Sequence, residues 1–111
     1  MNESVRDLHK RLGKTVAELS KRLGTVTTTE EAEAILREME EVNFRVTVAG
    51  RLLFAETTAS LNERIDRVLG AADDVDAEIE SLEKVRDVVR AVGSYLGTVD
   101  KVLDALKQRI L

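Results

Sequence analysis

The sequence predicts an all-α protein, built as a long antiparallel helical hairpin with a shorter N-terminal helix packed against it. Apolar residues recur at every seventh position near the C-terminus, at Val75, Leu82, Val89, Leu96, Leu103 and Ile110. The chain contains no Pro, so no residue type obliges a helix to lose a backbone hydrogen bond. Its Val and Thr residues fall at helical spacing and not in alternation, which favours helices over strands.

The first expected helix spans residues 4–23. Val5, Leu12 and Leu19 lie seven apart and give the helix one apolar face. Gly24 and the threonine-rich segment after it should end the helix, because Gly suits a left-handed C′ position and β-branched residues favour extended backbone. Thr28 and Glu31 have the spacing of a capping box, which predicts a new helix near residue 29.

The second expected helix spans residues 29–69. Its apolar residues follow a helical period up to Leu53, slip in phase at residues 56–60 and resume at Leu61. We interpret the slip as a stutter in one continuous helix, because no Gly or Pro marks it. The alternative is a true break, with Ser60 and Glu63 capping a new helix.

The third expected helix spans residues 73–110, after a turn at residues 70–73. Gly70 fits a C′ position, and Asp73 or Asp74 can accept hydrogen bonds from the first amides of the next helix. The unbroken seven-residue spacing across this segment instead favours one continuous helix. That helix would be about 120 Å long, far beyond ordinary lengths, so the turn is preferred.

Three glycines are expected to form a close contact between the two long helices. A reversal near residue 71 places Gly50 opposite Gly93, and Gly97 extends the notch by one helical turn. Small residues at facing positions allow two helix backbones to approach closely. The alternative is that Gly97 and Thr98 begin a separate last helix.

Composition excludes several classes of function. The whole chain, residues 1–111, is expected to be one domain with a net charge of −4, and its basic residues are interleaved with acidic ones. This pattern disfavours binding to nucleic acid. The least polar run, residues 42–61, contains Arg45, Arg51 and Glu56, which is incompatible with an ordinary membrane span. Without a recognisable signal peptide, the protein is expected to be cytoplasmic.

No constellation of residues predicts catalysis, a cofactor or a metal site. His9 is the only histidine and there is no Cys, so the partners of a metal or nucleophilic centre are missing. The acidic residues between Glu30 and Glu41 are interpreted as a solvated helix face. Arg45 and Arg51 suggest a rival hypothesis, in which they bind an anion in a small-molecule site or a small helical enzyme. In the simpler interpretation, both guanidinium groups extend to the edge of the bundle or pair with Glu56 or Asp87 of a neighbouring helix.

The apolar pattern predicts a homodimer, with a tetramer as the next choice. The N-terminal helix is too short to cover the hairpin near its turn, yet the apolar residues there exceed what two facing seams can bury. The expected interface comprises Phe54, Leu61, Ile65, Val68, Val75, Ile79, Leu82, Val85 and Val89. The sequence therefore predicts a non-enzymatic, self-associating helical bundle that acts as a scaffold or binds another protein.

Overall fold

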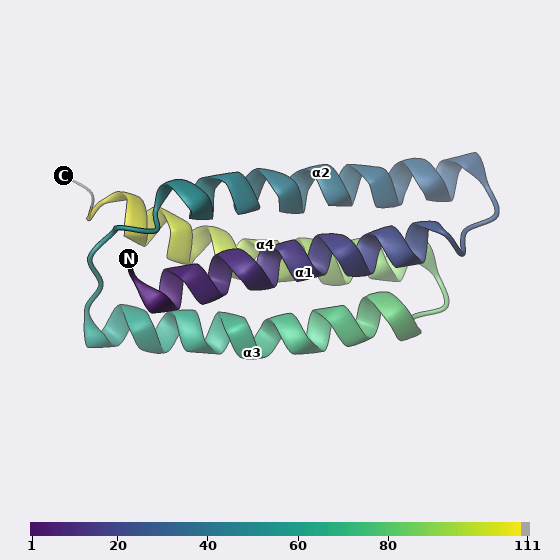
Figure 1. Cartoon of the computed structure of the whole chain (residues 1–111). Coiled ribbons are helices and arrows are strands. Elements are labelled where there is room, and N and C mark those ends of the chain that lie inside the picture. The colour runs from purple at the N-terminus through teal and green to yellow at the C-terminus, as the bar shows by residue number, and fades with distance from the viewer. Residues whose placement is uncertain (110–111) are drawn as a thin grey trace.

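The computed structural model describes residues 1–109 and shows four helices of similar length packed around one core (Figure 1). The helices are α1 (Glu3–Leu23), α2 (Thr29–Arg51), α3 (Ala59–Ser81) and α4 (Val85–Lys107). The bundle measures 46 × 20 × 18 Å, and Asn2 and Arg109 lie at the same end of it, where both bond to the segment between α2 and α3. The all-α prediction is confirmed. The predicted arrangement, a long hairpin with a shorter N-terminal helix, is wrong.

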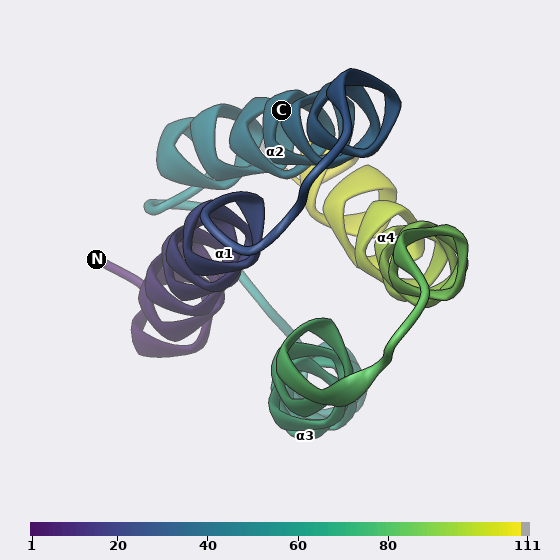
Figure 2. The same ribbon diagram turned by 90° about the vertical axis from the view of Figure 1, so that its right-hand side faces the viewer.

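Each helix packs against two others. Viewed along the bundle, α1 touches α2 and α3, and α4 touches the same two helices, so α1 and α4 lie diagonally opposite (Figure 2). The segment between α2 and α3 therefore crosses the end of the bundle from one corner to the opposite one. The other two connections join neighbouring helices.

The start of α2 follows the predicted capping box. The Thr28 side chain accepts a hydrogen bond from the Glu31 amide at 3.1 Å, and the Glu31 carboxylate lies 3.0 Å from the Thr28 hydroxyl. The predicted end of the first helix is also confirmed, although Gly24 has right-handed backbone angles (φ −67°, ψ −12°) and not the left-handed ones expected.

The phase slip near residue 56 marks a true break and not a stutter. Helix α2 ends at Arg51, and α3 begins after Thr58, whose hydroxyl accepts a hydrogen bond from the Leu61 amide at 3.1 Å. Thr58, and not Ser60, is therefore the N-cap. The connection is held from both chain ends, since Asn2 bonds to Leu53, Ala55 and Thr57 and Arg109 bonds to the Glu56 carbonyl.

The predicted turn at residues 70–73 is also wrong. Gly70 lies in the middle of α3, and no Gly in residues 1–109 has a positive φ, so none forms a left-handed C′ cap. The chain reverses instead at residues 82–84. Arg22 of α1 stabilises this reversal by donating hydrogen bonds to the carbonyls of Ile79, at 2.8 Å, and Glu83, at 3.0 Å. The Ile79 carbonyl is one that the end of α3 leaves unpaired, and the Glu83 carbonyl lies in the reversal itself.

Helix α4 runs without interruption through Gly93 and Gly97, so residues 97–98 do not begin a separate helix. Ile110, the last member of the expected heptad series, lies outside the described residues. Within residues 1–109, none of the helices is long and apolar enough to cross a membrane.

Candidate functional site

The interior contains one polar cluster, formed by Arg11 and Thr15 of α1 and Asp76 of α3. The Thr15 hydroxyl donates to the Asp76 carboxylate at 2.8 Å, and an Arg11 amino group donates to the other carboxylate oxygen at 3.3 Å. Arg11 also bonds to Asp73 at the surface. Burial raises the pKa of Asp76, while Thr15 and Arg11 oppose that shift. The cluster is therefore internally paired, as buried charges usually are.

Tyr95 of α4 enters the same region from the opposite corner. Its side chain is buried, and its hydroxyl has no hydrogen-bond partner within the described part of the chain. Burial, followed by the nearby Asp76 carboxylate, raises the pKa of Tyr95 to about 12. The hydroxyl is thus a neutral group in the core at physiological pH.

Arg45, one of the two cations of the rival hypothesis, is paired with acidic side chains of its own chain. It binds the Asp100 carboxylate of α4 with two hydrogen bonds of 2.9 Å, and it also bonds to Glu41. These bonds, with Asp100 first, raise the pKa of Arg45 further. Arg51 is exposed at the end of α2. Arg45 therefore pairs with Asp100 and Glu41 and not with Glu56 or Asp87. Of the two cations, Arg45 and Arg51, Arg45 is already neutralised.

The expected dimer interface is largely the core of a single chain. Leu82 and Val89 are half-buried, whereas six further members are buried in the chain: Leu61, Ile65, Val68, Val75, Ile79 and Val85. The uncovered strip that motivated the interface is absent here, because the breaks at residues 52–58 and 82–84 create four helices that cover it. Phe54 alone of this set is exposed, at 80%.

The glycines do not form the expected notch. A Cβ at Gly50 would lie 3.3 Å from the His9 ring of α1, whereas a Cβ at Gly93 or Gly97 would meet no atom within 4 Å. Both α4 glycines are exposed. The close approach at Gly50 is therefore to α1, because α2 and α1 pack as neighbouring antiparallel helices. His9 is half-buried against this contact.

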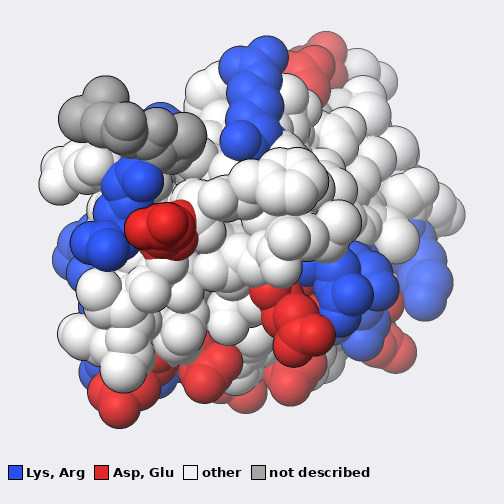
Figure 3. Space-filling model, turned by 60° about the vertical axis from the view of Figure 1, so that its left-hand side comes forward, with Lys and Arg blue, Asp and Glu red and all other residues white. Residues whose placement is uncertain are grey.

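Within residues 1–109, four large apolar side chains are exposed: Met1, Leu36, Phe44 and Phe54. Met1 and Phe54 adjoin Asn2 and Leu53, which are joined by a backbone hydrogen bond of 2.7 Å, so both lie at the end of the bundle that holds the chain termini. Figure 3 views the molecule from that side and shows uncharged surface between separate groups of basic and acidic residues.

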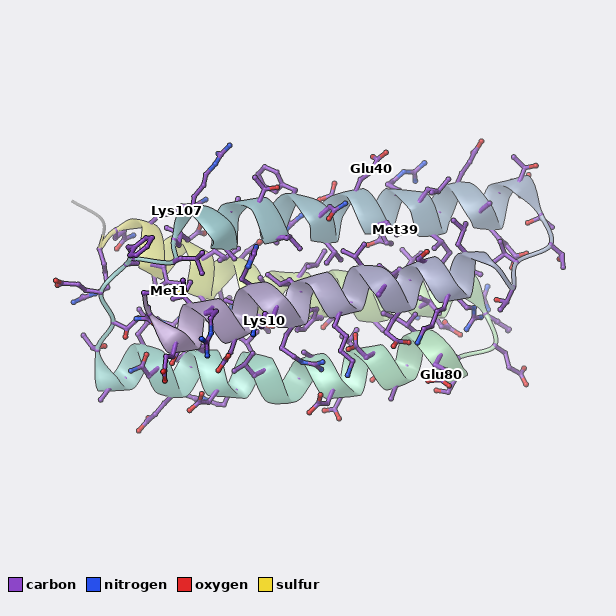
Figure 4. All side chains as sticks on the ribbon, in the orientation of Figure 1. Met1, Lys10, Met39, Glu40, Glu80 and Lys107 are labelled. Atoms are coloured by element: carbon purple, nitrogen blue, oxygen red, sulfur yellow. The ribbon has the colours of Figure 1, made fainter. Side chains whose placement is uncertain are left out.

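Side-chain directions along α2 separate the core from the solvent. Figure 4 shows Met39 pointing toward α1 and Glu40 pointing away from the bundle. Glu38, between the core and the surface, has a pKa raised by burial and by Glu41. In residues 1–109, no group of three or more His, Cys, Asp or Glu side chains is placed to hold a metal ion.

The fold and these contacts define a four-helix bundle with a diagonal connection between its second and third helices. Comparison with protein-family models, curated proteins and solved structures finds no match to this chain.

Proposed function

We propose that this protein is a non-enzymatic helical bundle that associates with itself and acts as a scaffold or protein-interaction module. The main support is that the charged groups reaching its interior are tied to partners in the chain. Asp76 is held by Thr15 and Arg11, and Arg45 is held by Asp100 and Glu41. Reactive or ligand-binding centres usually keep such groups available in a pocket.

The surface offers contacts of the kind that protein partners use. Phe44 is 62% exposed and Phe54 is 80% exposed, and large aromatic side chains are enriched at protein–protein interfaces. The Arg45 guanidinium lies 5.7 Å from the centre of the Phe44 ring, which holds part of this surface in place. A homodimer remains our first choice of assembly, although its contact must differ from the interface expected from the sequence.

The rival role, an anion-binding bundle or small enzyme using Arg45 and Arg51, is less favoured. Binding an anion at Arg45 would require it to replace both bonds to Asp100, which are charge-assisted and bidentate. Such a replacement exchanges one anion for another with little gain.

Sedimentation equilibrium of the full chain, from micromolar to millimolar concentration, tests the proposal. We expect a reversible increase in mass from the 12.3 kDa of one chain to a defined multiple. A mass that stays at one chain throughout would refute self-association. A calorimetric titration with phosphate, compared between the wild type and Arg45→Gln, tests the rival, which predicts heat that depends on Arg45.

A further inference from the structure

Helix α3 carries opposite charges at the two ends of the surface that it forms with α4. Arg64 and Arg67, in the first half of α3, line a hollow together with Lys101 of α4. Asp74 and Glu78, in the second half of α3, line the next hollow along the same pair of helices. Thr98 lines both hollows, so they are adjacent on this surface, which we call the groove.

The four charges on α3 have no ion-pair partner within the described residues. None of the salt bridges in residues 1–109 involves Arg64, Arg67, Asp74 or Glu78. They do not pair with one another, since the basic and acidic residues are between about 10 and 21 Å apart along the helix at 1.5 Å per residue. Asp74, Glu78 and Arg67 are exposed, and Arg64 is half-buried.

These charges are arranged symmetrically about one point of α3. The midpoint between Arg67 and Asp74 falls between residues 70 and 71. The midpoint between Arg64 and Glu78 is residue 71. When two copies of a helix cross antiparallel at that point, each Arg faces an acidic residue of the other copy. The crossing point carries Gly70 and Ala71, and a Cβ at Gly70 would meet no atom within 4 Å.

We propose that a second copy of this chain packs on the α3–α4 surface about a two-fold axis at residues 70–71. This proposal rests on the self-association proposed above and specifies its contact surface. In it, Arg64 of each protomer pairs with Glu78 of the other, and Arg67 of each pairs with Asp74 of the other. Small residues at the axis allow the two α3 helices to approach closely.

The size and symmetry of the surface fit this occupant. Two adjacent helices of 23 residues offer roughly 700 Å² of surface per protomer, near the size of a standard stable interface. A purely acidic or purely basic partner would complement only one end of the groove. A second copy complements both ends with the same four residues, and a two-fold contact closes at two chains.

Charge-sorted variants test this arrangement. Arg64→Glu with Arg67→Glu makes the charged face of α3 acidic, whereas Asp74→Arg with Glu78→Arg makes it basic. We expect each double variant alone to dimerise at least about ten-fold more weakly than the wild type, because its paired contacts become repulsive. An equimolar mixture of the two should form a one-to-one heterodimer with an affinity near that of the wild type.

A matched control carries the same charge change on another helix. Arg37→Glu with Arg51→Glu alters two exposed residues of α2 and should leave the dimer dissociation constant within about two-fold of the wild type, since long-range charge effects are screened. The masses are measured by sedimentation equilibrium, and helical circular dichroism checks that every variant folds.

The outcomes separate this proposal from the one on which it rests. A wild-type dimer that is insensitive to both charge-sorted variants would overturn the α3–α4 contact and leave self-association standing. A mixture that does not recover the heterodimer would also overturn the contact. A wild type that stays monomeric at millimolar concentration would overturn both proposals.

Discussion

Replacing Tyr95 by Phe should stabilise the protein. The Tyr95 ring is packed in the core, but its hydroxyl has no hydrogen-bond partner in residues 1–109. In the unfolded chain this hydroxyl bonds to water, so folding removes a hydrogen bond without supplying another. Tyr95→Phe removes the hydroxyl while keeping the ring and its packing.

The expected gain follows from the cost of an unpaired buried group. Leaving a buried donor or acceptor without a partner costs about 1–3 kcal/mol, and local relaxation recovers part of that cost. We therefore expect the free energy of unfolding to rise by about 1 kcal/mol in Tyr95→Phe. For a domain of this size, the melting temperature should rise by roughly 4 °C. Urea denaturation followed by circular dichroism measures the first quantity, with the m-value unchanged.

Thr15→Val is the matched control, because it removes a buried hydroxyl that does have a partner. Thr15 donates to Asp76 at 2.8 Å, so its loss leaves a buried carboxylate with fewer donors and should lower the unfolding free energy by about 1–3 kcal/mol. A loss of about 1 kcal/mol or more in Tyr95→Phe would refute the reasoning, since it would mean that the Tyr95 hydroxyl is paired in solution.

Four further outcomes follow from the contacts described. Thr58→Ala should lower the unfolding free energy by about 1 kcal/mol through loss of the α3 N-cap, with a smaller effect for Ser60→Ala, as measured by urea denaturation. Gly70→Ala should raise it by about 1 kcal/mol, because Gly70 is mid-helix with open space at its Cβ; a loss would support a turn there. Arg45→Gln should lower it by about 1–2 kcal/mol because of the Asp100 bonds, whereas Arg51→Gln should change little. Burial raises the pKa of Asp76 in the folded state, so the stability that this shift contributes is present at acid pH and is lost as the pH rises above the ordinary carboxyl value of about 4. The unfolding free energy of the wild type minus that of Asp76→Asn should therefore fall with rising pH, as measured by denaturation across pH.

The helix boundaries that the sequence predicted are those with local causes. The start of α2 depends on Thr28 and Glu31, which are three residues apart. The Thr28 side chain accepts from the Glu31 amide as expected, whereas the Glu31 carboxylate accepts from the Thr28 hydroxyl and not from its backbone amide. The end of α1 follows from the Gly and Thr residues after it. Such signals act through neighbouring backbone groups, so the sequence itself contains them.

The two missed boundaries have distant causes. The segment after α2 is held by Asn2, 53 to 55 positions earlier, and the reversal after α3 is held by Arg22, 57 and 61 positions earlier. Neither segment contains Gly or Pro, and Gly70, which does resemble a helix end, is accommodated inside α3. A local pattern cannot reveal a hydrogen bond that depends on how the helices pack.

The pairing of Arg45 was missed for the same reason. Arg45 was expected to pair with Glu56 or Asp87, and its partner is Asp100 because α2 and α4 pack as neighbours in the bundle. The unpaired Tyr95 hydroxyl carries no sequence signal, since Tyr occupies an ordinary apolar position of the heptad pattern. The change from basic to acidic residues along α3 is present in the sequence. Its arrangement on one helix follows only when Gly70 is known to be helical.

The sequence predicted three helices in the chain, and the structure has four in residues 1–109. Two long helices cannot bury all of their apolar side chains, and a four-helix core was the expected solution, with two copies of a hairpin supplying it. The chain instead supplies all four helices itself, by breaking where tertiary hydrogen bonds stabilise a reversal, and this buries Leu61, Ile65 and Val75 internally. Hydrophobic burial of that core therefore no longer requires a partner. Any self-association must depend on the surface, where the unpaired and self-complementary charges of α3 provide a specific reason for two chains to meet.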